Sequence, residues 1–249
     1  MKDNFSNQAT TYAQFRPDYP SELFDFILQN VENKQVAWDV ATGNGQAAKV
    51  LAAHFKQIVA TDLSQKQIDN AVKLPNIKYS VGRAEATDFA DNSFDLITVA
   101  QAVHWFDFEK FYAEVRRVAK PNATIAIWAY ARPEFIIQKS LDKTFQNFYY
   151  NVIGKYWDAE RQHIDAHYRT VPFPFSEIQT ANFPMTFNWH QYEFEGYLNS
   201  WSSVQNFKKA NDGFSPIEEL MLDMSADWGE FNRETVSFPI FLTLGKVEK

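Results

Sequence analysis

The sequence predicts an α/β protein built on a mostly parallel sheet. Five short runs have the length and composition of strands: 36–40, 57–60, 76–81, 94–100 and 123–129. Segments whose apolar residues recur at helical spacing separate these runs. Because strands that alternate with helices form right-handed βαβ units, we expect the strands to lie side by side in one parallel sheet.

Each helix expected in the first half has its own signal. The apolar residues recur every three or four positions over 21–31, 46–55, 64–74 and 107–118. Ser64 and Asp107 have the side chains of helix N-caps. The fifth strand, 123–129, is apolar enough to be buried on both faces of the sheet.

The second half is richer in aromatic residues, which make up 16% of the chain. Helical spacing recurs over 135–150, 158–168, 194–207 and 217–228, and strands are expected at 180–189 and 234–247. The last helix is opened by a capping box at Ser215-Pro216-Ile217-Glu218.

Composition excludes several classes of protein. The 249 residues include no cysteine, so disulfides, zinc–thiolate sites and a cysteine nucleophile are excluded. The net charge of −7 argues against a nucleic-acid-binding protein. The polar first residues lack a signal-peptide core, and no apolar run is long enough to span a bilayer, so we expect a cytoplasmic protein without a membrane partner. His163 and His167 have no third ligand in register, and we predict a solvated helix face rather than a metal site.

The turn after the first strand carries the main functional signal. Two glycines in Ala41-Thr42-Gly43-Asn44-Gly45 let the backbone turn tightly and let a ligand approach the main chain. Asp62 follows about twenty residues later, where an acidic side chain commonly binds ribose hydroxyls. Asp39 would repel a pyrophosphate but suits a cationic ligand, which favours S-adenosylmethionine over a nicotinamide cofactor. An ordinary strand–helix turn, in which Asp39 only holds loop amides, stays open as the alternative.

Tyr12 and Arg16 lie four residues apart before two prolines. One helical turn would place both on the same side, where the arginine could bind a carboxylate with two parallel hydrogen bonds. The alternative is an N-terminal arm that docks on the core through its aromatic residues.

Taken together, these segments resemble a class I S-adenosylmethionine-dependent methyltransferase, and within that class the trans-aconitate and cantharidin group of small-molecule methyltransferases. The matching segments are 12–20, 38–46, 60–64, 83–85 and 94–106. They span about half of the chain in the expected order, and His104-Trp105-Phe106 is the most group-specific of them.

The resemblance implies a Rossmann-like sheet of seven strands, the last antiparallel, with a helical lid. It implies one domain, 1–249, whose core is 34–130 plus strands near 178–190 and 234–248. The lid would be formed by 1–31, 132–176 and 191–232. Its many aromatic side chains are compatible with an apolar acceptor pocket as well as with core packing.

The resemblance also implies which residues bind the cofactor. Asp39, the Gly43–Gly45 backbone and Gln46 would hold its methionine end, Asp62 its ribose, and Leu63, Ala84 and Glu85 its adenine. The full predicted set is Tyr12, Arg16, Asp39, Ala41, Gly43, Gly45, Gln46, Asp62, Leu63, Ala84, Glu85 and Gln101.

His104 and Trp105 are the candidate catalytic residues. Methyl transfer from a sulfonium needs no acid, so orientation supplies most of the rate, and a carboxylate acceptor needs no base. His104 could be a base for a hydroxyl or carbon acid, a hydrogen-bond donor to an anion, or only a loop-positioning residue. Trp105 could offer its indole N–H to the substrate or form a wall of the substrate site.

Two other functions stay open at this point. One is a nicotinamide-dependent oxidoreductase, and the other is a non-catalytic protein that binds S-adenosylmethionine. Nucleic-acid methylation is disfavoured, because Ala100-Gln101-Ala102-Val103 replaces the Pro-Pro turn of base N-methyltransferases and no cysteine is present. The prediction is therefore a methyltransferase acting on a small molecule that is apolar or anionic, such as a carboxylate.

Overall fold

The computed structural model describes residues 18–228 and 233–249. Tyr12 and Arg16, two of the predicted cofactor-binding residues, therefore lie outside the described residues.

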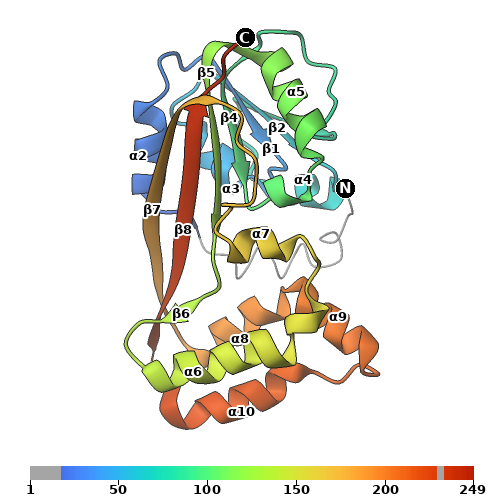
Figure 1. Ribbon diagram of the computed structural model, residues 1–249, viewed down its shortest axis with the longest axis vertical. Helices are drawn as coiled ribbons and strands as arrows, with labels where there is room; N and C mark the ends of the chain where they lie inside the picture. Colours follow the sequence, from blue (N-terminus) through green and yellow to red (C-terminus); the bar gives the residue numbers. More distant parts are fainter. Residues whose placement is uncertain (1–17, 229–232) are drawn as a thin grey trace.

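One mixed sheet forms the body of the protein (Figure 1), with β3, β2, β1, β4, β5 and β8 in that order. Strands β1 to β5 are parallel, β8 is antiparallel to β5, and both β7 and the short β6 pair with β8. The strands are β1 (Val36–Val40), β2 (Gln57–Asp62), β3 (Ile77–Val81), β4 (Phe94–Ala100), β5 (Ala119–Tyr130), β6 (Glu134–Phe135), β7 (Ser176–Trp189) and β8 (Glu234–Lys246). The predicted fold class, parallel strands with one antiparallel strand, is confirmed.

The described helices are α2 (Ser21–Gln29), α3 (Gln46–Leu51), α4 (Gln65–Asp69), α5 (Phe108–Val118), α6 (Lys139–Asn147), α7 (Arg161–Asp165), α8 (Gln191–Asn199), α9 (Ser202–Ala210) and α10 (Pro216–Trp228). Ser64 and Asp107 cap α4 and α5 as predicted, because their side chains accept hydrogen bonds from the backbone N–H groups of Gln67 and Lys110.

Several helices are shorter than the sequence predicts. The helix expected over 64–74 ends at Asp69, where the side chains of Asn70 and Lys73 donate to the carbonyls of Lys66 and Ile68. These bonds occupy carbonyls that a continuing helix would use itself. The expected 135–150 helix begins only at α6, because the chain first pairs with β8 as β6, and the segment expected over 194–207 is broken into α8 and α9.

The two faces of the sheet are covered by different helices because neighbouring strand residues point to opposite sides. Ala37 packs with α2 and α3, whereas Trp38 packs with α5. Asp39 therefore shares the face of Ala37 at the end of a buried strand. This arrangement directs a polar side chain toward the edge where the parallel strands finish.

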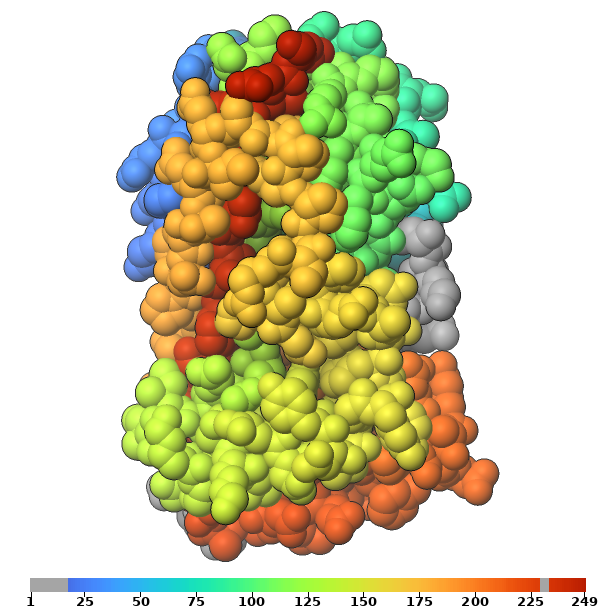
Figure 2. Space-filling model, in the orientation of Figure 1, coloured from blue at the N-terminus to red at the C-terminus, as the bar shows by residue number. Residues whose placement is uncertain are grey.

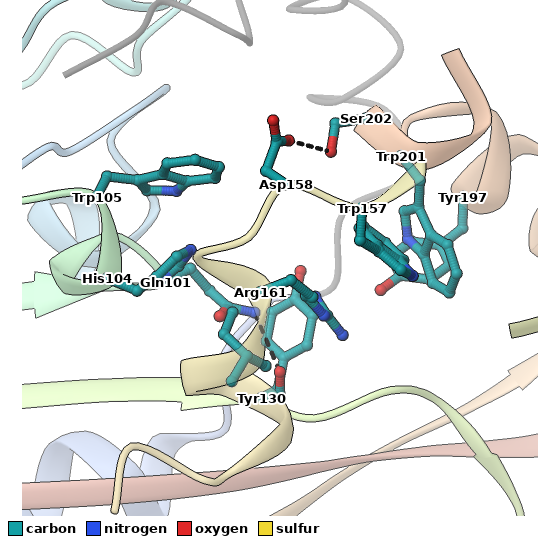
Figure 3. A pocket seen from close by; sticks show the side chains of 11 residues that line it. Gln101, His104, Trp105, Tyr130, Trp157, Asp158, Arg161, Tyr197, Trp201 and Ser202 are labelled. Carbon is teal, nitrogen blue, oxygen red and sulfur yellow. Dashed lines mark hydrogen bonds between the residues drawn. The ribbon is translucent and has the colours of Figure 1, made fainter. Parts of the chain in front are cut away.

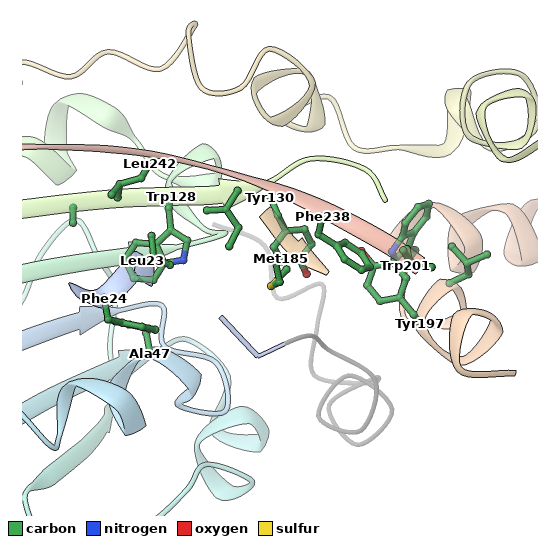
Figure 4. Close-up of a cluster of buried hydrophobic side chains, with 14 of the residues drawn as sticks. Leu23, Phe24, Ala47, Trp128, Tyr130, Met185, Tyr197, Trp201, Phe238 and Leu242 are labelled. Carbon is green, nitrogen blue, oxygen red and sulfur yellow. The ribbon is translucent and has the colours of Figure 1, made fainter. Parts of the chain in front are cut away.

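The core continues without a break from the sheet into the second half of the chain. Figure 4 shows Trp128 and Phe24 at the sheet end of this cluster and Phe238, Tyr197 and Trp201 at its other end, along the length of β8. We call α6, α8, α9 and α10 the cap helices. Because they share one apolar core with the sheet, their position relative to the strand ends is fixed by packing.

The segment that carries α7 lies between the sheet and the cap helices (Figures 1 and 2), coloured yellow across the middle of the face shown. Within the described ranges, no helix has the length and apolar composition needed to cross a bilayer.

Candidate functional site

Two neighbouring cavities lie at the carboxyl ends of the parallel strands, the position where open α/β sheets bind ligands. The glycine-turn cavity is lined by Asp39, Ala41, Thr42, Gly43, Gln46 and Gln101, among others. The aromatic cavity is lined by Gln101, His104, Trp105, Tyr130, Trp157, Asp158, Arg161, Ile164, Tyr197, Trp201 and Ser202. Gln101 belongs to both linings, so the two cavities meet at the end of β4.

The turn after β1 is held by its own backbone and by Asp62. The Thr42 N–H donates to the Thr61 carbonyl at 2.9 Å, and Gly43 and Gly45 have φ of 57° and 85°. One Asp62 oxygen accepts from the Gly43 N–H at 2.9 Å and the other from the Ser64 N–H at 2.8 Å. Asp62 therefore joins the glycine turn to the start of α4, although it is outside the lining of the glycine-turn cavity.

Gly45 has a steric reason to be glycine. A Cβ at this position would lie 2.3 Å from the Tyr79 hydroxyl oxygen, whereas a Cβ at Gly43 would meet none of the described residues within 4 Å. Both residues have the left-handed backbone that glycine tolerates best.

Asp39 is 1% exposed and accepts hydrogen bonds from two hydroxyls, Thr42 at 2.5 Å and Thr98 at 2.8 Å. Burial raises the pKa of Asp39 to about 6, against these hydroxyl bonds that lower it. Asp39 thus does hold the turn, and it also lines the cavity. A cationic ligand would relieve the cost of burying its charge.

The predicted adenine residues lie on two loops: Leu63 directly follows β2, and Ala84 and Glu85 follow β3. Ala84 is buried, and Leu63 and Glu85 are partly exposed. The Glu85 Oε1 accepts from the Asp107 N–H at 3.4 Å, while its buried Oε2 accepts no hydrogen bond from the described residues. The same oxygen lies 3.8 Å from the Nε of the exposed Arg83, a long ion pair that leaves it able to accept a hydrogen bond.

Ala41 and Gln101 end β1 and β4 in the left-handed region, with φ of 52° and 55°. Such a backbone is costly for non-glycine residues and often accompanies function. The Gln101 N–H donates to the Trp128 carbonyl at 2.9 Å, and its buried Oε1 has no partner in the described part of the chain. Gln101 is thus fixed where the two cavities join.

His104 and Trp105 form a one-turn 3-10 helix after β4 and both line the aromatic cavity. The His104 Nδ1 lies 2.8 Å from the Tyr168 hydroxyl oxygen. Burial, with the nearby charges of Arg161 and His163, lowers the pKa of His104 to about 3, so its ring is neutral near pH 7.

Sequence reasoning missed the other side of the aromatic cavity. Figure 3 shows Trp157, Tyr197 and Trp201 opposite Trp105, with Arg161 between them. These residues come from α7, α8 and the segments beside them. The aromatic enrichment of the second half was a signal, but spacing gave no reason to bring these particular residues together.

His163 and His167 do not share a helix face, because α7 ends at Asp165 and His167 has a φ of 51°. His163 lies 2.7 Å from the Thr170 hydroxyl, and His167 stacks on Phe241. Within the described residues, no three His, Asp or Glu side chains gather as a metal site would require.

Comparisons with known proteins agree on one family. Residues 38–127 match the family model described as a methyltransferase domain. A Dictyostelium discoideum protein assigned as a methyltransferase is 34% identical, over 99% of this chain and 95% of its own length. A solved structure from Anaeromyxobacter dehalogenans, assigned as a type II methyltransferase, has a TM-score of 0.85 and 34% identity, and the match covers 94% of this chain and 99% of that chain.

A more distant structure shares the fold. Phosphoethanolamine N-methyltransferase 2 of Haemonchus contortus, solved with S-adenosyl-L-methionine, has a TM-score of 0.52 at 18% identity. The match covers 98% of this chain and 57% of that chain.

The fold and the strand-end site define a class I methyltransferase. The chain belongs to the S-adenosylmethionine-dependent methyltransferases, and S-adenosylmethionine is its cofactor. The oxidoreductase alternative is not favoured. The residues present fit this cofactor, because a buried carboxylate and a glycine turn lie at the strand ends, and buried oxygens of Gln101 and Glu85 accept no hydrogen bond from the described residues.

Proposed function

We propose that the protein transfers the methyl group to a small molecule held in the aromatic cavity. The observation that carries this proposal is that Gln101 lines both cavities, so an acceptor in one lies beside a methyl donor in the other. The aromatic cavity is lined by large rings with a few polar groups among them, which suits a compact organic molecule.

On the cofactor side we assign roles by the chemistry of each group. Asp39 binds the positively charged methionine end, beside the backbone of Gly43 and the Gln46 side chain. Asp62 accepts from the ribose hydroxyls in addition to its two backbone contacts, since each carboxylate oxygen can accept more than one bond. Glu85, with Leu63 and Ala84, lines the adenine site, where its Oε2 accepts from the exocyclic amine. Tyr12, Arg16, Ala41, Gly45 and Gln101 complete the proposed set.

When bound, S-adenosylmethionine would supply a methyl group bonded to a cationic sulfur. An acceptor lone pair would form a bond to the methyl carbon, in line with the carbon–sulfur bond that breaks, and the sulfur would keep the electrons of that bond. The protein's contribution is orientation, which can account for roughly 7–11 kcal/mol of the barrier. The aromatic rings form much of the acceptor site, and Gln101, fixed by its backbone, lies where the two binding sites meet.

For His104 we infer the role of hydrogen-bond donor rather than base. Tyr168 is buried, and among the described residues its hydroxyl has one hydrogen-bond partner, the His104 Nδ1. If the phenol donates there, Nδ1 is the acceptor and the neutral ring carries its proton on Nε2. The opposite arrangement would leave the buried Tyr168 proton without an acceptor, which costs about 1–3 kcal/mol. We propose that the Trp105 ring packs against the acceptor beside His104.

We also propose the finer points that rest on the family resemblance. The acceptor is an apolar or anionic compound, as in the trans-aconitate and cantharidin group. The chain is a single domain with its core at 34–130 and near 178–190 and 234–248, and it works in the cytoplasm without nucleic-acid or membrane partners.

The test separates small from large acceptors. The purified protein is incubated with S-adenosylmethionine carrying a tritiated methyl group and with a cell extract divided by size at about 1 kDa. We expect protein-dependent label in a small organic product from the low-mass fraction. Label found only in protein or nucleic acid would contradict the proposal.

A further inference from the structure

Arg161 places a positive charge in the wall of the aromatic cavity. Its side chain is 17% exposed, and its guanidinium carbon lies 4.6 Å from the centre of the Trp157 ring. The charge lowers the pKa of His104 across the same space. A mostly buried cation is costly unless something compensates its charge.

The contacts of Arg161 use one edge of its guanidinium. The Nε–H donates to the Tyr149 hydroxyl at 2.9 Å, and Tyr149 in turn donates to Asp165 at 2.8 Å. Asp165 itself lies 3.6 Å from the Arg161 Nε and is largely exposed, so it balances the charge only in part. Within 18–228 and 233–249, the two terminal nitrogens make no hydrogen bond.

We propose that the methyl acceptor carries one carboxylate on an apolar, ring-sized body, and that Arg161 binds this carboxylate through its terminal nitrogens. This inference rests on the proposed function and names the substrate class. Two parallel N–H groups of a guanidinium match the two oxygens of a carboxylate.

Two further donors line the same cavity. One donor is the buried indole N–H of Trp157, which has no hydrogen-bond partner among the described residues. The other is the proposed Nε2–H of His104. The walls beyond these donors are the rings of Trp105, Tyr197 and Trp201, which suit an apolar body.

Asp158 limits how much negative charge the acceptor can carry. Its carboxylate also lines the cavity, accepts from the Ser202 hydroxyl at 3.2 Å and points away from Arg161 (Figure 3). The single positive charge of Arg161 balances one carboxylate, and the negative charge of Asp158 repels the further charges of a tricarboxylate or a phosphate dianion. A cationic amine would fit Asp158 but would be repelled by Arg161.

The first experiment compares ligands on the unaltered protein. With the protein saturated by S-adenosylhomocysteine, calorimetry measures binding of 3-phenylpropanoate and of its uncharged twin, 3-phenylpropanamide. We expect the carboxylate to bind about tenfold more tightly, as a charged hydrogen-bonded pair would. Equal binding of the two, or tighter binding of phenethylamine, phenyl phosphate or tricarballylate, would overturn the inference.

The second experiment changes the arginine. Arg161→Gln should remove the preference for the carboxylate and leave the amide unaffected, and Arg161→Lys should keep part of it. Arg169→Gln is the matched control, since it removes the same charge from an exposed position in the same segment. If Arg161→Gln does not fold, the Arg161→Lys variant and the ligand pair still decide.

Binding of S-adenosylhomocysteine is measured first in every sample. A protein that fails to bind it contradicts the proposed function itself. A protein that binds it but does not distinguish the carboxylate from the amide contradicts only the role given to Arg161.

Discussion

The glycine-turn cavity and the aromatic cavity differ in how the chain builds them. The first is made mostly from residues within a few positions of the ends of β1 and β4, and much of it is backbone. The second collects side chains from β4, β5, α7, α8 and α9, which are far apart in the sequence. A site of the first kind is encoded locally, whereas a site of the second kind exists only after the cap helices have packed.

The two cavities also differ in charge. A buried carboxylate, Asp39, lines the first, and a mostly buried guanidinium, Arg161, lines the second. A cationic donor and an anionic acceptor would each find the opposite charge on its own side. Opposite charges in the two cavities therefore favour each ligand in its own site and disfavour it in the other.

The largest expected effect is on the backbone of the first cavity. Gly45→Ala should destabilise the protein by roughly 2–4 kcal/mol, through left-handed strain and a clash with the Tyr79 hydroxyl. That hydroxyl cannot move freely, because it donates to the Val72 carbonyl at 2.8 Å. Urea unfolding measures the loss, and calorimetry should show weaker S-adenosylhomocysteine binding.

Gly43→Ala is the matched control, because its Cβ would meet none of the described residues and the expected cost is backbone strain of roughly 1–2 kcal/mol. Adding Tyr79→Phe to Gly45→Ala should recover part of the loss. If the two alanine variants are equally stable, the close contact with Tyr79 is not what requires glycine at 45.

This contrast explains what could be predicted from the sequence. The strands, the Gly43–Gly45 turn and the N-caps follow from local patterns, because periodicity, φ requirements and capping act over a few residues. Arg161 could not be predicted as a pocket residue, because its short helix reads as polar and solvated. Its burial follows from packing between the sheet and the cap helices, which no local pattern specifies.

The next expected effect concerns the charge of Asp39. Since its pKa is about 6, binding of S-adenosylhomocysteine should weaken as the pH falls from 7 to 5, approaching tenfold per pH unit below 6. Asp39→Asn should weaken binding by about a hundredfold at pH 7 and abolish this dependence. Calorimetry across the pH range checks both.

The raised pKa of Asp39 also has a signed effect on stability. A carboxyl whose folded pKa exceeds its unfolded pKa binds more protons when folded, so the free energy of unfolding falls as the pH rises from about 4 to about 6. The upward shift from 3.8 to about 6 corresponds to roughly 3 kcal/mol, and Asp39→Asn should remove that slope from urea-unfolding data. An unchanged slope in the variant would assign the titration to another group.

A smaller effect is expected on the acceptor side. His104→Ala should leave S-adenosylhomocysteine affinity nearly unchanged and lower methyl transfer about tenfold, the value of one hydrogen bond to a charged group. Steady-state rates with the identified acceptor, beside calorimetry of the cofactor product, separate the two sites. Unchanged turnover would remove His104 from the mechanism, and an equal loss in cofactor binding would show that the cavities are not independent.

The smallest effect is expected from Tyr168→Phe, which deletes only the hydroxyl that contacts His104. The ring can then carry its proton on either nitrogen, so the Nε2–H form is no longer enforced, and turnover should fall about threefold. Nitrogen NMR of labelled histidine reports the tautomer directly: protonated Nε2 in the unaltered protein, and a mixture in the variant.

Tyr112→Phe is a suitable control, because that buried hydroxyl has no hydrogen-bond partner among the described residues and the residue does not line the cavity. If the unaltered protein carries its proton on Nδ1, the Tyr168 hydroxyl is the acceptor, Nε2 is free to take a proton, and His104 becomes a base rather than a donor.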